Sequence, residues 1–122
     1  MRLSLALTLP LILWAPSVDG SGKRAPSSRQ KTMTVSATAY CQAGRTATGD
    51  RTRPGIVAAD PRVLPLGTVM RITGPRKEYQ GTYKVADVGS AVKGRIIDIF
   101  MPSCREAIRF GRQRVHLEVL AN

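Results

Sequence analysis

The sequence predicts an all-β fold with small α content, a closed barrel of six short strands and one short helix. Six segments have the apolar content or the alternation of strands, and turn residues such as Gly, Pro and Asp separate them. No helical segment recurs between successive strands, as a parallel βαβ sheet would require. Six short strands of this kind favour a closed β-barrel. The 122 residues, 43% of them apolar, suffice for one small domain.

The first strand is predicted over residues 33–40, where apolar side chains alternate with polar ones at the period of a strand. Residues 46–55 follow as a loop rich in Gly, Pro and Asp. The remaining predicted strands are residues 56–59, 68–72, 80–88, 95–100 and 116–120.

One short helix is predicted between the last two strands. Ser103 and Glu106 have the spacing of a capping box, in which each side chain satisfies a free backbone amide of the other. The next apolar residues, Ala107, Ile108 and Phe110, form a stripe. Gly111 is suited to end the helix.

The first twenty residues have the order of a secretory signal peptide. One positive charge precedes the almost wholly apolar residues 3–15, and Val18 and Gly20 are small residues suited to a signal peptidase. The apolar run is short for a membrane span, and Pro10 interrupts it. We therefore predict that residues 1–20 are cleaved and the protein exported; the alternative is an uncleaved N-terminal anchor.

Residues 21–34 are predicted to be a basic flexible linker and residues 35–122 the barrel domain. The chain has 19 Lys and Arg against 8 Asp and Glu, a formal charge of +11. Such a field concentrates a protein at anionic polymers. Because an exported protein rarely meets DNA, we expect no nucleic-acid partner. Cell-wall glycan and other anionic envelope polymers are the expected partners, with no stable membrane span once the signal is removed.

Cys41 and Cys104 are the only cysteines of the chain. In an exported protein, an even pair predicts a disulfide. The alternative is a reactive Cys104, because the start of a helix favours a thiolate.

The acidic residues are the best candidates for chemistry. The sequence has no HExxH or CxxC motif, and its single histidine makes a His-based metal site improbable. Asp60 and Asp87 each end an apolar strand, and Asp98 lies between two isoleucines. A buried Asp98 would have a raised pKa and could serve as a general acid. Simple alternation, with the isoleucines in the core and Asp98 facing water, is the other interpretation.

Residues 87–98, with the sequence DVGSAVKGRIID, resemble the signature of the three-aspartate, or 3D, domain family. That signature reads Asp-x-Gly-Gly-x-Ile-Lys-Gly-x-x-Ile-Asp. Residues 57–68 resemble the family's strand that carries its first Asp, and residues 110–115 its closing strand. Ser90 stands where the family usually has a second Gly, and Val92 stands for Ile.

The resemblance implies a double-psi β-barrel, similar to the catalytic barrel of membrane-bound lytic transglycosylases. Those enzymes cleave the β-1,4 bond between N-acetylmuramic acid (MurNAc) and N-acetylglucosamine (GlcNAc) in peptidoglycan and leave a 1,6-anhydro product. By position in the motif, Asp98 would be the general acid/base. Asp87 would tune its proton or fix the following loop, and Asp60 would complete the cleft.

The resemblance also implies that the glycan is bound by four residues: Thr48, Gly89, Lys93 and Gly94. The two glycines would let the backbone approach the sugar. No metal and no cofactor is expected. The location would be outside the cytoplasm, in the periplasm, at the outer membrane or in the extracellular cell wall. A non-catalytic peptidoglycan-binding or wall-loosening module, as in expansin-like barrels, is the alternative function.

Overall fold

The computed structural model describes Pro10 and residues 30–122. The predicted signal peptide, apart from Pro10, and most of the predicted linker lie outside these residues. None of the helices described there is long and apolar enough to cross a membrane.

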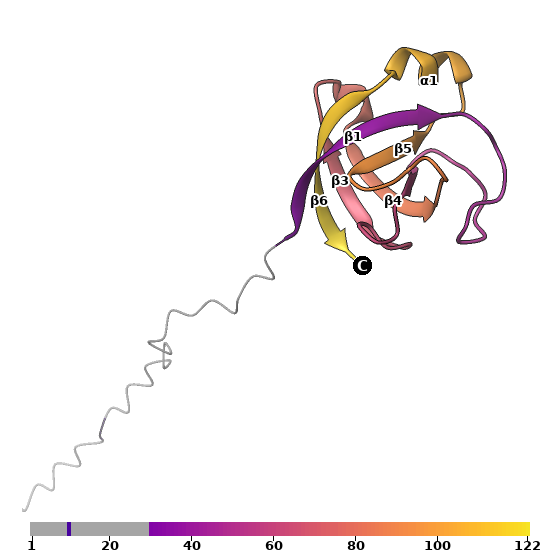
Figure 1. Ribbon diagram of the computed structural model, residues 1–122. Coiled ribbons are helices and arrows are strands. Elements are labelled where there is room, and N and C mark those ends of the chain that lie inside the picture. The colour runs from indigo at the N-terminus through magenta and orange to yellow at the C-terminus, as the bar shows by residue number, and fades with distance from the viewer. Residues whose placement is uncertain (1–9, 11–29) are drawn as a thin grey trace, which may run out of the picture.

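Six strands form a closed barrel in the order β1-β5-β2-β4-β3-β6 (Figure 1). Their bounds are β1 Thr32–Tyr40, β2 Ile56–Ala59, β3 Val69–Thr73, β4 Gly81–Asp87, β5 Ile96–Phe100 and β6 Gln113–Ala121. The pairs β1–β5 and β2–β4 are parallel, and the other four are antiparallel. The predicted six-stranded barrel is therefore confirmed, and closure leaves no sheet edge unpaired.

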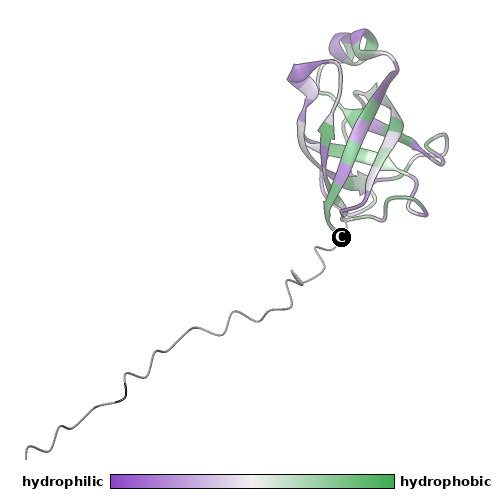
Figure 2. Ribbon diagram, turned by 90° about the vertical axis from the view of Figure 1, so that its left-hand side faces the viewer, coloured by the Kyte–Doolittle hydropathy of each residue, from purple (hydrophilic) through white to green (hydrophobic). Residues whose placement is uncertain are grey.

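Hydrophobic and hydrophilic residues alternate along the strands (Figure 2), and most of the buried apolar side chains form one core cluster. On β1 the core side chains are Val35 and Ala37, and on β5 they are Ile97 and Ile99. A smaller apolar cluster of Ile56, Ala86 and Phe100, with Tyr40 packed against it, is separate from this core. The strand period thus sends one set of side chains inward and leaves the other set for the surface.

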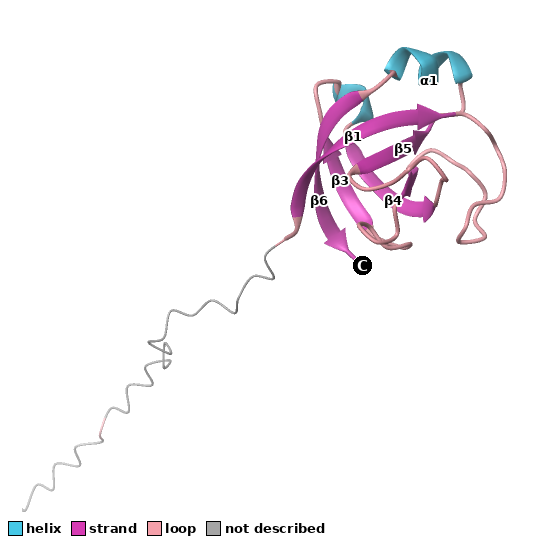
Figure 3. Cartoon of the chain, in the orientation of Figure 1, coloured by secondary structure: helices cyan, strands magenta, loops and turns pink. Residues whose placement is uncertain are grey.

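The strand ends differ from the prediction in ways that backbone pairing explains. β1 begins at Thr32, inside the segment predicted as linker, because Thr32 pairs with Glu118 of β6. β6 begins at Gln113 rather than at residue 116, since Gln113 pairs with Ala37. Hydrogen bonds between strands extend beyond the apolar alternation that the sequence displays. A short 3₁₀ helix, η1 (Lys77–Tyr79), lies between β3 and β4 and was not predicted (Figure 3).

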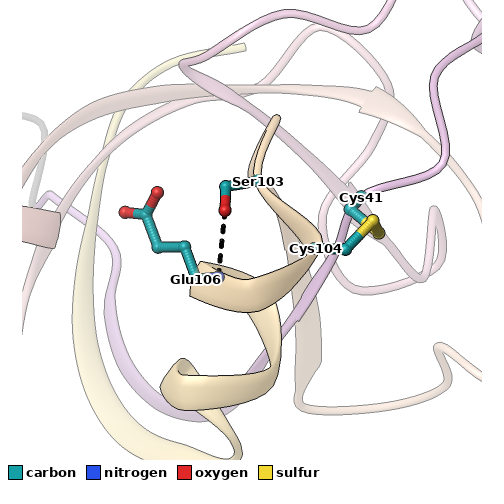
Figure 4. The surroundings of a disulfide bond; sticks show 4 residues. All are labelled: Cys41, Ser103, Cys104 and Glu106. Atoms are coloured by element: carbon teal, nitrogen blue, oxygen red, sulfur yellow. Dashed lines mark hydrogen bonds between the residues drawn. A yellow bond between two sulfur atoms is a disulfide. The ribbon is translucent and has the colours of Figure 1, made fainter.

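The predicted helix is present as α1 (Cys104–Phe110). The Ser103 hydroxyl accepts a hydrogen bond from the backbone N–H of Glu106 at 3.2 Å (Figure 4). Among the hydrogen bonds of the described residues, the return bond from the Glu106 side chain is not formed, so half of the capping box is realised. Gly111 ends the helix with a φ of 62°, a backbone conformation that favours glycine.

Cys41 and Cys104 form a disulfide, which excludes the reactive-thiol alternative in this state (Figure 4). The bond joins the residue after β1 to the first residue of α1. It therefore fixes the helix against the end of β1 and also fixes the start of the long loop 41–55.

Candidate active site

A row of side chains crosses four neighbouring strands on the outer face of the barrel. Thr38 of β1 is paired with Asp98 of β5, and Asp98 with Ala58 of β2. Ala58 is paired on its other side with Asp87 of β4. Residues directly opposite each other in a sheet share a face. Two of the three predicted aspartates are therefore brought together, with a single small side chain between them.

A register shift in β2 places Asp87 in this row. Ile56 and Val57 pair with Lys84 and Val85, so continued pairing would put Ala86 opposite Ala58. The irregularity between Val57 and Ala58 moves the pairing on by one residue, and Asp87 takes that position. Bulges of this kind re-aim side chains next to active sites.

Asp87 and Asp98 line one pocket of about 330 Å³. Ala58 lines the pocket too, and the strand ends and loops around it supply the other lining residues: Tyr40, Gln42, Ala43, Gly44, Arg45, Thr52, Val88, Gly89 and Val92. Pockets of this size, with a few convergent polar groups, are typical of ligand sites.

A hollow of about 390 Å³ lies over β1, β3 and β6, but its charged groups already have partners. Arg71 lies 3.7 Å from Glu118, and His116 Nδ1 shares a hydrogen bond of 2.9 Å with the Thr34 hydroxyl. The pocket that holds Asp87 and Asp98 is therefore the better candidate for chemistry.

Asp98 is partly buried in this pocket, between the inward-facing Ile97 and Ile99. Burial raises the pKa of Asp98, because loss of solvent disfavours the charged form. The Thr38 hydroxyl donates a hydrogen bond of 3.0 Å to Asp98 Oδ1, and this bond opposes the rise. The isoleucines face the core as alternation requires, while Asp98 lies partly buried on the opposite face with a raised pKa.

Replacing Thr38 with Val is expected to raise the pKa of Asp98 further. The substitution removes the hydrogen bond from Thr38 that favours the carboxylate, while burial is kept. Titration of the Asp98 carboxyl carbon by NMR measures the change directly. Thr34→Val is the matched control on the same strand, since the Thr34 hydroxyl bonds His116 and not Asp98. Equal titration curves for all three proteins would contradict the expectation.

Asp87 anchors the loop 41–55 to the end of β4. Its Oδ1 atom accepts hydrogen bonds from the backbone N–H of Ala47 at 3.1 Å and of Val88 at 2.9 Å. Both bonds are made to one oxygen, and among the described residues Oδ2 accepts no bond. Asp87 thereby holds a pocket wall and still presents an acceptor beside Ala58.

Asp60 lies elsewhere: it is 2% exposed and does not line the pocket. Its carboxylate accepts bonds from the guanidinium of Arg62 at 2.8 and 3.1 Å, and from the Arg62 backbone N–H at 3.0 Å. It also accepts a bond of 2.9 Å from the backbone N–H of Gly94. These bonds hold the pKa of Asp60 well below its ordinary value, and the bond from the Arg62 side chain has the largest effect. A carboxylate so fully bonded fixes the loop after β4 rather than completing the cleft.

Replacing Asp60 with Asn is expected to lower the melting temperature at pH 7 by several degrees. A depressed folded-state pKa contributes stability above the unfolded-state value, about 4, and that contribution is lost as the pH falls toward the folded value. The difference in melting temperature between wild type and Asp60→Asn should therefore become smaller below about pH 4. Thermal unfolding between pH 2 and pH 7 measures it. Asp50→Asn, at an exposed carboxylate 3.8 Å from Lys84, should change little. A gap independent of pH would show that the Asp60 charge is not responsible.

The four residues predicted to bind glycan are only partly brought together. Gly89 lines the pocket, and a Cβ there would meet a Val92 methyl carbon at 2.8 Å. Lys93 is exposed outside the pocket lining. Gly94 has a φ of 68°, and its N–H is bonded to Asp60, so it serves the turn. Thr48 bonds Thr46 and Asp50 within its own loop.

Ser90 occupies the position where the signature usually has a second glycine. Among the described residues, no residue other than glycine has a positive φ, so the backbone at Ser90 suits an ordinary side chain. This departure from the signature therefore introduces no backbone strain into the pocket wall.

The sequence did not single out Tyr40 or Arg45, which also line the pocket. Tyr40 had one available signal, because it shares the polar face of the predicted first strand with Thr38. Arg45 lies in an irregular loop, where no periodicity gives the direction of a side chain.

The architecture defines a class: closed six-stranded barrels of mixed pairing with a carboxylate-lined pocket on the outer face. Within that class, the chain belongs to the 3D domain family, whose model matches residues 55–121. The match includes all three predicted aspartates, Asp60, Asp87 and Asp98.

Three relatives have names that refer to the cell wall or to peptidoglycan. The chain is 38% identical to YabE of Bacillus subtilis (strain 168), a candidate cell wall shaping protein, over 85% of this chain and 28% of YabE. It is 37% identical to the cell wall-binding protein YocH of the same organism, over 74% of this chain and 33% of YocH. It is 38% identical to RlpA of Nostoc sp., a candidate endolytic peptidoglycan transglycosylase, over 64% of this chain and 22% of RlpA. The chain thus spans a third or less of these relatives.

Solved structures share the barrel at low sequence identity. MltA from E. coli has a TM-score of 0.55 at 21% identity, over 65% of this chain and 28% of MltA. The Clavibacter michiganensis expansin has a TM-score of 0.56 at 20% identity, over 75% of this chain and 52% of the expansin. A Streptomyces papain inhibitor has a TM-score of 0.57 at 17% identity, over 75% of this chain and 96% of the inhibitor. At these identities the likeness establishes the fold alone.

Proposed function

We propose that this protein is an exported, peptidoglycan-active lytic transglycosylase, with Asp98 as its general acid/base. The observation that carries the proposal is a single partly buried carboxyl of raised pKa in an open pocket. The likeness of this chain to RlpA, a candidate peptidoglycan transglycosylase, supports peptidoglycan as the substrate. The disulfide, the cell-wall relatives and the basic charge support a location outside the cytoplasm.

The reaction needs only one proton-transferring group. Protonated Asp98 donates its proton to the oxygen of the β-1,4 bond as the bond from that oxygen to C1 of MurNAc breaks. The 6-hydroxyl of the same MurNAc attacks C1, and the Asp98 carboxylate takes the hydroxyl proton. The products are a GlcNAc-terminated glycan and a 1,6-anhydro-MurNAc end, and Asp98 is protonated again. Because no water is activated, the second carboxylate of a hydrolytic glycosidase is not needed.

In this proposal the other predicted site residues bind the glycan or fix the loops that form the pocket. Asp87 fixes the loop 41–55 and offers its second oxygen to a sugar hydroxyl. Gly89 lets the backbone approach the glycan, and Lys93 attracts anionic substituents from outside the pocket. Asp60 acts through Gly94, by fixing the loop that forms one pocket wall.

The products of purified peptidoglycan test the proposal. The full chain, produced in an oxidising compartment, is incubated with the polymer, and soluble products are analysed by mass spectrometry. Muropeptides with 1,6-anhydro ends are expected. Reducing ends in their place would mean hydrolysis, for which a second catalytic carboxylate would be required.

A non-catalytic peptidoglycan-binding or wall-loosening role is the second candidate. It is favoured by the likeness to YocH, named as a cell wall-binding protein, and by the fold shared with an expansin. Retention of the chain on insoluble peptidoglycan without release of any soluble fragment would favour this role over catalysis.

A further inference from the structure

We propose that the hydroxyl of Tyr40 is a glycan-binding group that donates a hydrogen bond to a sugar oxygen in the pocket of Asp87 and Asp98. The inference deepens the proposed function and rests on glycan binding at that pocket. The acceptor of this hydrogen bond would be a hydroxyl or acetamido oxygen of the sugar.

The strand geometry places Tyr40 in the site. Tyr40 follows Thr38 by two residues on β1, so both side chains lie on the same face as Asp98. Tyr40 is paired with Phe100 in the register that pairs Thr38 with Asp98. Its side chain is partly exposed and lines the same pocket as both carboxylates.

Packing fixes the ring in place. The rings of Tyr40 and Phe100 meet edge to face, with centroids 5.4 Å apart, and Tyr40 packs against the cluster of Ile56, Ala86 and Phe100. An aromatic side chain held in this way retains little rotamer freedom that a ligand would have to remove. The position of the ring is therefore fixed before a ligand binds.

The hydroxyl itself lacks a hydrogen-bond partner among the described residues, although its oxygen is closed off from solvent. A buried polar atom without a partner is costly, and native structures rarely retain one without a reason. Neither carboxylate of the pocket accepts a bond from it. Contact with a sugar oxygen therefore requires an entering ligand to displace the atoms that cover this hydroxyl.

The ionisation state of Tyr40 suits a donor. Burial, with a smaller effect from the charges of Asp87 and Asp98, raises its pKa to about 12. The phenol therefore keeps its proton at physiological pH and can donate a hydrogen bond, but it cannot act as a base.

The test is Tyr40→Phe, which removes the hydroxyl and keeps the ring that packs on Phe100. Affinity for purified peptidoglycan is measured by co-sedimentation, alongside the melting temperature of the full chain. We expect affinity to fall roughly three- to tenfold, the value of one hydrogen bond, with no loss of melting temperature. Thr68→Val is the matched control, because Thr68 Oγ1 is also a buried hydroxyl without a partner among the described residues, and it does not line this pocket.

Each outcome decides the inference. Weaker binding by Tyr40→Phe alone, with the melting temperature kept, supports it. Wild-type affinity in Tyr40→Phe overturns it and leaves the proposed function intact. An equal loss of affinity in Tyr40→Phe and Thr68→Val, or a lower melting temperature in Tyr40→Phe, makes the hydroxyl structural and also overturns it. If the wild type neither binds nor cleaves peptidoglycan, the proposed function fails and the inference with it.

Discussion

Asp98→Asn is expected to slow the release of anhydro-muropeptides by about 10²–10⁴-fold, the usual contribution of general acid–base catalysis. The amide cannot give a proton to the glycosidic oxygen or take one from the 6-hydroxyl. Mass spectrometry of peptidoglycan digests at matched protein concentration measures the loss.

The fold should survive this substitution. The side-chain oxygen of Asn can still accept the bond that the Thr38 hydroxyl donates to Asp98. Because burial raises the pKa of Asp98, stability falls as the pH rises from the unfolded-state value, about 4, to the folded-state value, and the loss stays constant above it. The neutral amide is free of this cost, so the variant should melt no lower than wild type at pH 7.

Glu118→Gln is the control for the loss of one acidic charge. Glu118 pairs with Arg71 over a different part of the barrel, so its replacement should leave product release unchanged. Full activity in Asp98→Asn would remove Asp98 from the mechanism. Lost activity with intact peptidoglycan binding would confirm its role in the chemistry.

The double variant Cys41→Ala/Cys104→Ala is expected to lose about 4 kcal/mol of folding free energy. The two residues are 63 positions apart, and constraint of a loop of that length in the unfolded chain is worth about that much. For a domain of this size, the loss corresponds to a fall of roughly 15–30 °C in melting temperature. Small domains have few other sources of stability of this magnitude.

Calorimetry with and without a reducing agent measures the disulfide's contribution. Reduction should bring wild type to the melting temperature of the double variant and should leave the variant unchanged. A reduced wild type that melts like the oxidised form would contradict the prediction.

The strands were predictable because their periodicity is local. Residues 33–40 alternate strictly, and β1 indeed sends Val35 and Ala37 into the core. The start of α1 was predictable for a similar reason, since Ser103 and Glu106 are three residues apart. The extra length of β1 and β6 was not, because it depends on pairing between segments far apart in the chain.

The site was predictable only in part. The family signature named Asp87 and Asp98, and the structure places both in one pocket. The resemblance of residues 57–68 to the family also named Asp60, whose role is decided by contacts with Arg62 and Gly94 that no pattern displays. The register shift beside Ala58 and the unpartnered hydroxyl of Tyr40 are consequences of tertiary packing, and a sequence carries no local mark of either.

The direction of β1 decides how the protein can be attached to a support. Thr32 begins the strand and Tyr40, at the pocket, ends it; nine residues of strand separate these ends by roughly 25 Å. Whatever is joined before Thr32, whether a bead, an anchor or another domain, is therefore held at the far end of β1 from the carboxylates. Immobilisation through the N-terminus should leave the pocket open to an insoluble polymer, whereas attachment through the loop 41–55 should block it.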